Sequence, residues 1–456
     1  MKTNKKQISM LKLLISMTLV IILCIGAIMP VFAADPAKGE DSEHPAVAVM
    51  TKLLKMPIGT ITPDATFTFE FEPVSVDGTL YNNTNMPEIE NKIVTFNPGK
   101  ETSKNPKTDN GVKEFWIETD NIVENDGVAI VWPHAGKYIY YVTEKEDVGI
   151  YDGITEWMIY SKAKYKIEVL VYEDPTTNEL YVAYIIANRI KDDEGNPLLD
   201  PEKVDPTPGD DSTHDYSQVL FTNEYAKTNG RDPEDPDPKD DPRNAAFEIS
   251  KKVSGPFAEK SDRFDFTVTI KKPAAAFPLA DSNYKYKAYV VKTDDIYTNL
   301  TSTDHYSGIK GTSPDQYIEF TSDVPLTVKL QHDEKLIFVD MPVGASFKVN
   351  EKVDMYATRY KASYFIILDG SAEVKEVSPT FGADFAVYPS RTLYIGENTN
   401  SVRYENLTDT TAPMGISVSD LPYVMIIALT LISLAGVVVL ITRKYNKRPV
   451  DSADDN

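Results

Sequence analysis

Short stretches in which apolar and polar residues alternate recur along most of the chain. Residues 66–71 read Thr-Phe-Thr-Phe-Glu-Phe, and residues 136–144 and 165–172 show the same period of two, with turn residues between the stretches. A period of two places successive side chains on opposite faces of a β-strand. Many short strands separated by turns are typical of β-sandwiches. The pattern therefore predicts an all-β fold, which the 26 tyrosines also favour.

The strand-rich body repeats itself once. Each half has a lysine before a Phe-X-Phe strand, then a glycine and an alternating strand that leads to a glutamate, and last an aromatic residue two positions before an asparagine. We therefore expect two tandem immunoglobulin-like β-sandwich domains, at 45–227 and 245–409. The repeated residues are Lys52, Phe67, Phe69, Gly136, Glu144, Phe221 and Asn223 in the first half, and Lys251, Phe264, Phe266, Gly344, Glu351, Tyr404 and Asn406 in the second.

Two polar segments interrupt the alternating pattern. Residues 191–215 are rich in Asp, Pro and Gly, which predicts an exposed loop near the end of the first domain. Residues 228–244 alternate acids with prolines, which predicts an extended, semi-rigid linker between the domains. A calcium-binding loop is the alternative for the linker, but the glycine turn and distal glutamate of an EF-hand are missing.

The N-terminal segment, residues 1–33, has the features of a secretory signal peptide. Lysines precede an apolar run, and the run ends in the small-residue site Val31-Phe32-Ala33. An uncleaved membrane anchor is the alternative, but the apolar run is short for a membrane span.

The C-terminal segment, residues 411–448, contains an apolar stretch from Leu421 to Thr442 that is long enough to cross a membrane. Basic residues follow it at once, beginning with Arg443 and Lys444, and such residues stay in the cytosol. With a signal peptide in front, the body between the two ends lies outside the cell. An export signal paired with a C-terminal hydrophobic stop is typical of Gram-positive surface proteins.

Composition excludes several classes of function. The net charge of −22 argues against nucleic acid and against anionic membrane surfaces as partners. The only cysteine, Cys24, lies in the signal peptide, so the exported body forms no disulfide. The five histidines are scattered, and there is no Gly-X-Ser-X-Gly motif, phosphate-binding loop or metal-ligand spacing. We therefore expect no enzyme activity, cofactor or metal.

Parity along the strands directs several polar side chains toward the core. Lys251 shares its strand face with apolar neighbours, and Glu351, Asn406, Glu144 and Asn223 likewise follow apolar residues in phase. For Lys52 the assignment is weaker, because valines at 47 and 49 occupy the opposite face, and Lys55 is a rival. An inward lysine or glutamate costs several kcal/mol unless it is neutralised or paired.

The recurrence of Lys, Glu and Asn in the same order suggests that the three lie together. Desolvation lowers the pKa of a lysine and raises that of a glutamate, which favours a neutral amine and a neutral acid. A neutral amine can attack the asparagine carboxamide, which the acid polarises, and release ammonia to leave a Lys–Asn amide. A buried Lys–Glu ion pair beside an asparagine is the alternative, and parity alone leaves both open.

Short motifs spread over most of the exported body resemble the streptococcal T-antigen type of backbone pilin. The resemblance implies two sandwich domains that each carry an isopeptide bond, Lys52–Asn223 with Glu144 as the catalytic residue and Lys251–Asn406 with Glu351. The motifs are Met50-Thr51-Lys52, Phe67-Thr68-Phe69, Tyr141-Val142-Thr143-Glu144, Phe221-Thr222-Asn223, Lys251-Lys252-Val253-Ser254-Gly255, Pro342-Val343-Gly344 and Leu421-Pro422-Tyr423.

The residues before the apolar stretch resemble a sortase sorting signal. Pro413 and Gly415 match the family motif, whereas Met414 stands where the family has Thr. The resemblance implies that a sortase joins the Met414 carboxyl to a lysine of another copy; Lys203 is the chosen acceptor, with Lys191 and Lys227 behind it. The implied partners are the sortase, further copies, minor pilins and peptidoglycan. The chain would then be an extracellular, wall-anchored pilus subunit that supports adhesion.

The alternative is a surface adhesin that is anchored to the cell wall or membrane and displayed singly. A tip adhesin would be expected to carry a further ligand-binding domain, and none is visible beyond the two repeated modules. Nothing in the sequence points to a particular surface receptor.

Overall fold

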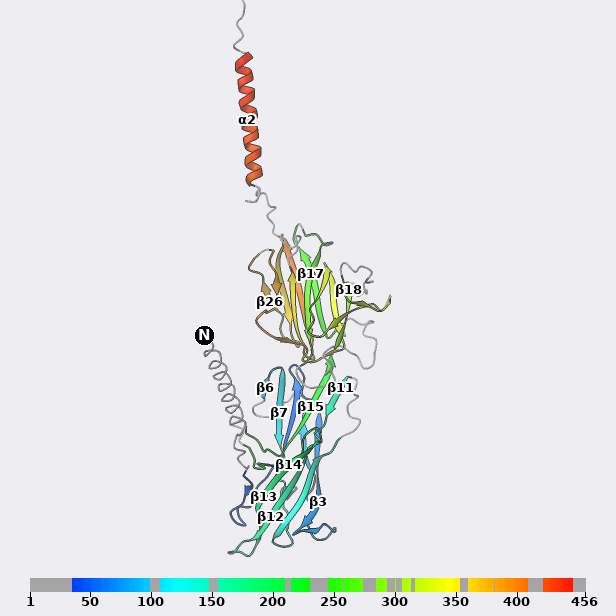
Figure 1. Cartoon of the computed structure of the whole chain (residues 1–456), viewed down its shortest axis with the longest axis vertical. Coiled ribbons are helices and arrows are strands. Elements are labelled where there is room, and N and C mark those ends of the chain that lie inside the picture. Colours follow the sequence, from blue (N-terminus) through cyan, green and yellow to red (C-terminus); the bar gives the residue numbers. More distant parts are fainter. Residues whose placement is uncertain are drawn as a thin grey trace, which may run out of the picture.

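The structure is a computed structural model, and its body consists of two β domains followed by one helix (Figure 1). The predictions of a β-rich body and of an apolar C-terminal helix are confirmed. Residues 1–33, predicted to be a signal peptide, most of the predicted linker and Pro413-Met414-Gly415 lie outside the described residues. The described residues are 35–98, 107–146, 155–209, 215–229, 245–256, 258–273, 284–292, 300, 306–312, 316–352, 360–380, 382–408 and 421–445.

The first domain has two main sheets. The larger runs in the order β1-β13-β12-β10-β3-β4, with β14 beside β13 and β5 beside β3; the smaller runs β11-β15-β2-β7-β6. Their strands are β1 (Ala37–Lys38), β3 (Ala65–Val76), β4 (Thr79–Leu80), β5 (Lys92–Phe96), β10 (Gly136–Glu144), β12 (Lys164–Glu173), β13 (Leu180–Lys191) and β14 (Pro197–Val204) in the larger sheet, and β2 (Thr51–Pro57), β6 (Lys107–Asp109), β7 (Val112–Glu118), β11 (Glu156–Ile159) and β15 (Leu220–Asn229) in the smaller; β8 (Glu124–Asn125) and β9 (Val128–Ala129) form a separate ribbon.

The second domain also has two sheets, in the orders β19-β20-β18-β22-β16-β29-β25-β26 and β21-β17-β24-β27, with β28 beside β24. Their strands are β16 (Phe247–Ser254), β18 (Lys285–Lys292), β19 (Ile309–Lys310), β20 (Tyr317–Thr321), β22 (Glu334–Val339), β25 (Tyr360–Ile367), β26 (Val374–Val377) and β29 (Ser401–Thr408) in the first sheet, and β17 (Arg263–Lys271), β21 (Leu326–Gln331), β24 (Ser346–Lys352), β27 (Phe385–Ala386) and β28 (Leu393–Tyr394) in the second; β23 (Met341–Pro342) lies at the joint.

Each domain has its own hydrophobic core. One cluster of buried side chains spans residues 37–225, and a separate one spans 246–404. The alternating strands supply them: in β10, Tyr138, Tyr140 and Val142 are fully buried, whereas the residues between them are partly exposed. The period of two therefore decides which side chains enter the core.

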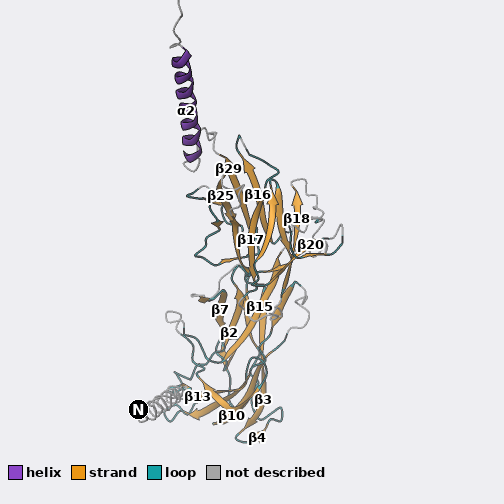
Figure 2. Ribbon diagram, turned by 45° about the horizontal axis from the view of Figure 1, so that its top comes forward, coloured by secondary structure: helices purple, strands orange, loops and turns teal. Residues whose placement is uncertain are grey.

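The helix α2 (Leu421–Tyr445) lies beyond the second domain (Figure 2). Its described side chains are exposed, and it is long and apolar enough to span a membrane. Residues 34–411 thus contain both cores and every strand of both domains, and that fragment can be studied without the helix.

The structure corrects two of the predicted segment boundaries. Residues 197–204, expected in a loop, form β14, because this stretch pairs with the end of β13 as a hairpin. Most of its side chains are exposed nonetheless. Thr228 and Asn229, expected in the linker, are the last residues of β15, because they pair with β23 of the second domain.

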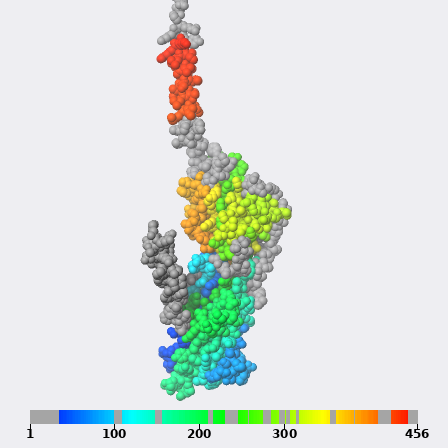
Figure 3. All heavy atoms as spheres, in the orientation of Figure 1, coloured from blue at the N-terminus to red at the C-terminus, as the bar shows by residue number. Residues whose placement is uncertain are grey.

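The joint between the domains is built from backbone pairing and one well-shielded ion pair. Thr228 and Asn229 pair with Pro342 and Met341, and Lys227 Nζ lies 2.7 Å from a carboxylate oxygen of Glu397. The two domains consequently follow one another along the long axis of the molecule (Figure 3).

Gly344 allows the domains to approach closely. Its φ is +82°, and an added Cβ would lie 2.3 Å from Cβ of Pro57 in the first domain. The Gly344→Ala change should therefore displace the second domain relative to the first, as well as add the cost of a left-handed L-residue, about 1–2 kcal/mol. Small-angle X-ray scattering of residues 34–411 would show an altered profile.

Gly78→Ala is the matched control, because Gly78 has a φ of +79° but an added Cβ would meet nothing within 4 Å. It should leave the scattering profile unchanged. Equal profiles for the two variants would contradict a role of Gly344 in the joint.

Candidate functional site: two buried lysine–glutamate–asparagine clusters

The first cluster lies inside the first domain. Lys52 of β2 is fully buried, and its Nζ donates a hydrogen bond of 2.7 Å to Oε2 of Glu144 in β10. Asn223 of β15, also fully buried, donates from Nδ2 to Oε1 of the same carboxylate at 2.7 Å. One carboxylate therefore holds the amine and the carboxamide side by side.

The second cluster has the same three residue types inside the second domain. Lys251 Nζ lies 2.7 Å from Oε1 of Glu351, and Asn406 Nδ2 donates to that same oxygen at 2.9 Å. All three residues are at most 3% exposed. Glu351 Oε2 is buried without a hydrogen-bond partner among the described residues. The two clusters thus share their composition but differ in how the carboxylate is used.

Strand register explains why the trios assemble. In each domain the lysine strand runs parallel to the asparagine strand, and the lysine stands opposite an aromatic residue: Lys52 opposite Phe221, and Lys251 opposite Tyr404. The asparagine lies two residues further along, on the same face. The glutamate comes from the other sheet, where β10 pairs with β3 and β24 pairs with β17. Each trio therefore bridges the two sheets of its sandwich.

Aromatic rings enclose both amines. Lys52 Nζ is 4.5 Å from the centre of the Phe67 ring, and Lys251 Nζ is 4.2 Å from that of Phe264. Phe69 packs against Phe221 with ring centres 4.9 Å apart on the first cluster's side of the core. These walls exclude water, which strengthens every electrostatic interaction inside the clusters.

Burial shifts the ionisation of these groups. It lowers the pKa of Lys52 and of Lys251 to about 8, although the neighbouring glutamate opposes the shift in each case. Burial also raises the pKa of Glu144, against the opposing effects of Lys52 and Asn223. Both changes bring the pair nearer to a neutral amine beside a neutral acid.

The structure separates Lys52 from its rival. Lys55 Nζ lies at the surface, 3.5 Å from Glu114, and its side chain is 35% exposed.

Lys203 lies on β14 opposite Asn188, and Lys191 is exposed at the end of β13. Among the described residues, no group of three or more His, Cys, Asp or Glu could hold a metal ion.

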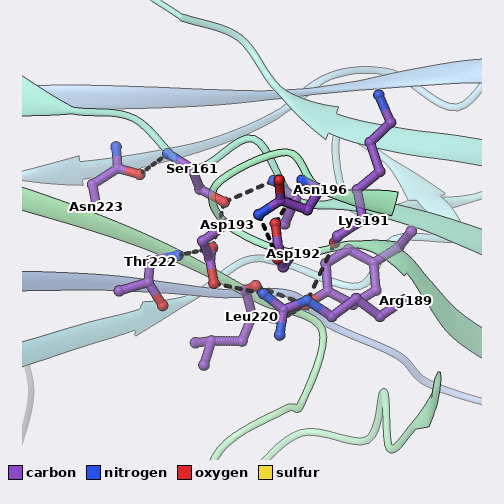
Figure 4. A network of polar contacts seen from close by, with 11 residues as sticks. Ser161, Arg189, Lys191, Asp192, Asp193, Asn196, Leu220, Thr222 and Asn223 are labelled. Atoms are coloured by element: carbon purple, nitrogen blue, oxygen red, sulfur yellow. Dashed lines mark hydrogen bonds and ion pairs between the residues drawn. The ribbon is translucent and has the colours of Figure 1, made fainter. Parts of the chain in front are cut away.

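A polar network beside the first cluster was not predicted from the sequence. Ser161 and Asp193 connect to Asn223 and Thr222 through hydrogen bonds (Figure 4). Both lie between strands, where neither alternation nor the repeat between the two halves applies to them. Only their spatial proximity to Asn223 reveals them.

Comparison with known proteins finds one family model and several solved structures. The model, described as a domain of unknown function (DUF7601), matches residues 245–378. No match was found among curated proteins.

Major pilins of Streptococcus pyogenes are among the matching structures. The major pilin of Streptococcus pyogenes matches with 17% identity and a TM-score of 0.30, covering 79% of this chain and 99% of that chain. The T-13 major pilin of the same organism matches with 14% identity and a TM-score of 0.28, covering 82% and 100%. The T3.2 major pilin gives 17% identity, a TM-score of 0.28, and coverage of 80% and 98%. The similarity is distant, and it covers about four fifths of this chain.

The lowered lysine pKa has a consequence for stability. Asn223→Ala keeps Lys52 beside Glu144 but removes the carboxamide, so the Lys52 amine remains free to titrate. Because the folded-state pKa is about 8 and the ordinary value is 10.5, the unfolded chain binds more protons between these two values. The free energy of unfolding of the first domain should therefore rise by about 3 kcal/mol as the pH increases from about 8 to about 10.5.

The control is Asn223→Ala combined with Lys52→Met, which lacks the titrating amine and should lack that rise. Urea unfolding followed by tryptophan fluorescence reports on the first domain alone, because all three tryptophans, Trp116, Trp132 and Trp157, lie within it. Parallel pH profiles for the two variants would show that Lys52 is not held with a lowered pKa.

Proposed function

We propose that this chain is the structural subunit of a sortase-assembled surface pilus, stabilised by two autocatalytic Lys–Asn isopeptide bonds. The observation that carries the proposal is the twofold occurrence of a buried trio, Lys52–Glu144–Asn223 and Lys251–Glu351–Asn406, at equivalent strand positions. The sequence motifs that resemble backbone pilins support the same function.

The chemistry follows from what the glutamate touches. A neutral Lys52 amine attacks Cγ of Asn223, so a bond forms between Nζ and Cγ and negative charge develops on Oδ1. Glu144, hydrogen-bonded to both nitrogens, carries a proton from Nζ to Nδ2. The Cγ–Nδ2 bond then breaks and one ammonia leaves. Glu144 is regenerated, and the same steps apply to Lys251, Glu351 and Asn406.

A purely structural ion pair accounts for less of what is observed. Buried ion pairs are often no more stabilising than apolar residues of similar volume, so stability alone gives little reason to keep one in each domain. An ion pair also has no need of an asparagine held on the same carboxylate. Bond formation uses all three residues and explains why both domains have them.

The bond positions suit a protein that bears tension. Each cross-link would join the first long strand of its domain to the last, β2 to β15 and β16 to β29, which are parallel neighbours. Pulling the two ends of a domain apart would shear these strands against each other. The covalent bond would bear that force, so the chain between the two strands would not be stretched. A covalent tie of this kind also restrains the unfolded chain, as a disulfide does. With Cys24 in the expected signal peptide, no disulfide can do so here.

Assembly and anchoring are proposed from the C-terminal region and the lysines of the first domain. The apolar helix α2 would hold the precursor in the membrane while a sortase acts at Pro413-Met414-Gly415. Lys203 is the proposed acceptor; it lies on the hairpin strand β14, most of whose side chains are exposed, and its own side chain is partly exposed. Lys227 is a weaker candidate, because its Nζ contacts both Glu397 and Glu156. Other copies, minor pilins and peptidoglycan would be the partners, and support of adhesion the outcome.

The intact mass of residues 34–411 tests the bonds. The mass should fall short of that calculated from the sequence by two ammonia molecules. Glu144→Ala and Glu351→Ala should each restore one of them, and the isosteric Glu144→Gln should do the same, because Gln cannot carry the proton. A mass equal to the calculated value would leave only ion pairs.

Denaturing gels of wall extracts test polymerisation. The intact chain, produced in a Gram-positive host with a pilus-type sortase, should give a ladder of high-mass species. Lys203→Arg should reduce the ladder to monomer, whereas Lys191→Arg, a nearby control, should preserve it. A single band from the unaltered chain would favour the singly displayed adhesin, for which the Met414 in place of Thr is the supporting observation.

A further inference from the structure

The carboxamide oxygen of Asn223 has a hydrogen-bond donor. Its Oδ1 accepts from the backbone N–H of Ser161 at 2.7 Å, and Ser161 is 3% exposed (Figure 4). The equivalent oxygen of the second domain, Oδ1 of Asn406, is buried with no hydrogen-bond partner among the described residues. The two clusters therefore differ at the one atom on which negative charge would develop.

The path of the chain explains why the Ser161 N–H lies beside Asn223. β11 pairs with β15, and that ladder ends at Ile159 opposite Glu224. The chain then leaves the smaller sheet and enters β12 of the larger one, so Ser161 crosses between the sheets beside Asn223. A buried backbone N–H needs an acceptor, and the side chain of Asn223 supplies it where the ladder has ended.

Asp193 holds this crossing segment in place. Its Oδ1 accepts hydrogen bonds from Ser161 Oγ at 2.6 Å and from the backbone N–H of Thr222 at 3.0 Å, and its backbone oxygen accepts from Lys162 N at 2.8 Å. Its Oδ2 lies 2.6 Å from Arg189. Asp193 thus ties Ser161 to the strand that carries Asn223.

We propose that the Ser161 N–H is an oxyanion donor that accelerates bond formation in the first domain, and that Asp193 is the residue that positions it. This inference rests on the proposed isopeptide chemistry. When Lys52 Nζ adds to Cγ of Asn223, the carbonyl electron pair moves onto Oδ1, and the Ser161 N–H already points at that oxygen. A donor fixed before reaction stabilises the charged intermediate without reorganisation. When ammonia leaves, Oδ1 becomes the carbonyl oxygen of the new amide and keeps its donor.

The decisive comparison is between two variants that differ only in the N–H at position 161. Nonsense suppression in a cell-free system can place the α-hydroxy acid analogue of alanine at position 161, which replaces the amide N–H with an ester oxygen. Ser161→Ala is the matched control, because it has the same side chain and keeps the N–H. Samples of residues 34–411 are quenched in acid at intervals, and the Lys52–Asn223 and Lys251–Asn406 peptides are quantified by mass spectrometry.

The ester should slow formation of the Lys52–Asn223 bond by roughly 100-fold relative to Ser161→Ala, the scale of losing one oxyanion donor. The Lys251–Asn406 bond should form at an unchanged rate in the same molecules. Equal rates at Asn223 for ester and amide would overturn the inference, and so would equal slowing of both bonds. If neither bond forms in the unaltered protein, the isopeptide proposal itself fails.

Hydrogen exchange gives a second measurement that does not depend on the ester variant. The Ser161 amide should exchange slowly in the unaltered protein and at least tenfold faster in Asn223→Ala, where its acceptor is gone. Rapid exchange in the unaltered protein would show that the donor is not formed, and would overturn the inference.

The role of Asp193 is tested by two substitutions. Asp193→Ala removes the acceptor for Ser161 Oγ and for the Thr222 N–H and should slow only the Lys52–Asn223 bond. Asp193→Asn keeps an acceptor oxygen at that position and should retain most of the rate. An equal loss in both variants would assign the effect to the negative charge and overturn positioning by hydrogen bonds.

Discussion

The removal of water from a lysine amine is the constraint on which the rest of this structure depends. A charged amine in an apolar core is unfavourable, and the aromatic walls around Lys52 and Lys251 bring both amines toward the neutral form. The neighbouring glutamate limits the fall in the lysine pKa, and its carboxylate accepts a hydrogen bond from the buried amine. The same desolvation that makes these lysines costly to bury favours the neutral amine that the proposed reaction requires.

The sandwich topology converts this local chemistry into a mechanical property. Because the lysine and asparagine strands are parallel neighbours, a single amide would join the first long strand of each domain to its last. The facing sheet supplies the glutamate that is proposed to carry the proton, so the reaction would depend on the two sheets having packed together. An isopeptide bond would therefore form only in a correctly folded domain, and it would then hold the two strands together covalently.

The two domains share the same trio of residues, but the hydrogen bonds around each trio differ. Glu144 divides its two oxygens between Lys52 and Asn223, whereas one oxygen of Glu351 serves both partners. The crossing segment with Ser161 adds a donor in the first domain. Beyond the clusters, the β15–β23 pairing and the Lys227–Glu397 contact couple the domains, so the asparagine strand of the first domain also forms part of the joint.

The sequence by itself determined the β-rich body, the repeat of Lys, Glu and Asn, and the inward direction of five of the six residues. The strands and the inward directions follow from a period of two along each strand, and the repeat follows from comparing the two halves of the chain. It left Lys52 and Lys55 as rivals, because Lys52 is preceded by apolar residues on both faces. Only the tertiary structure decided between them, since the choice depends on which lysine faces the opposite sheet, where Glu144 lies. For the same reason Ser161 and Asp193 escaped prediction: they lie in connections, where the position of a side chain is set by packing between sheets rather than by any local period.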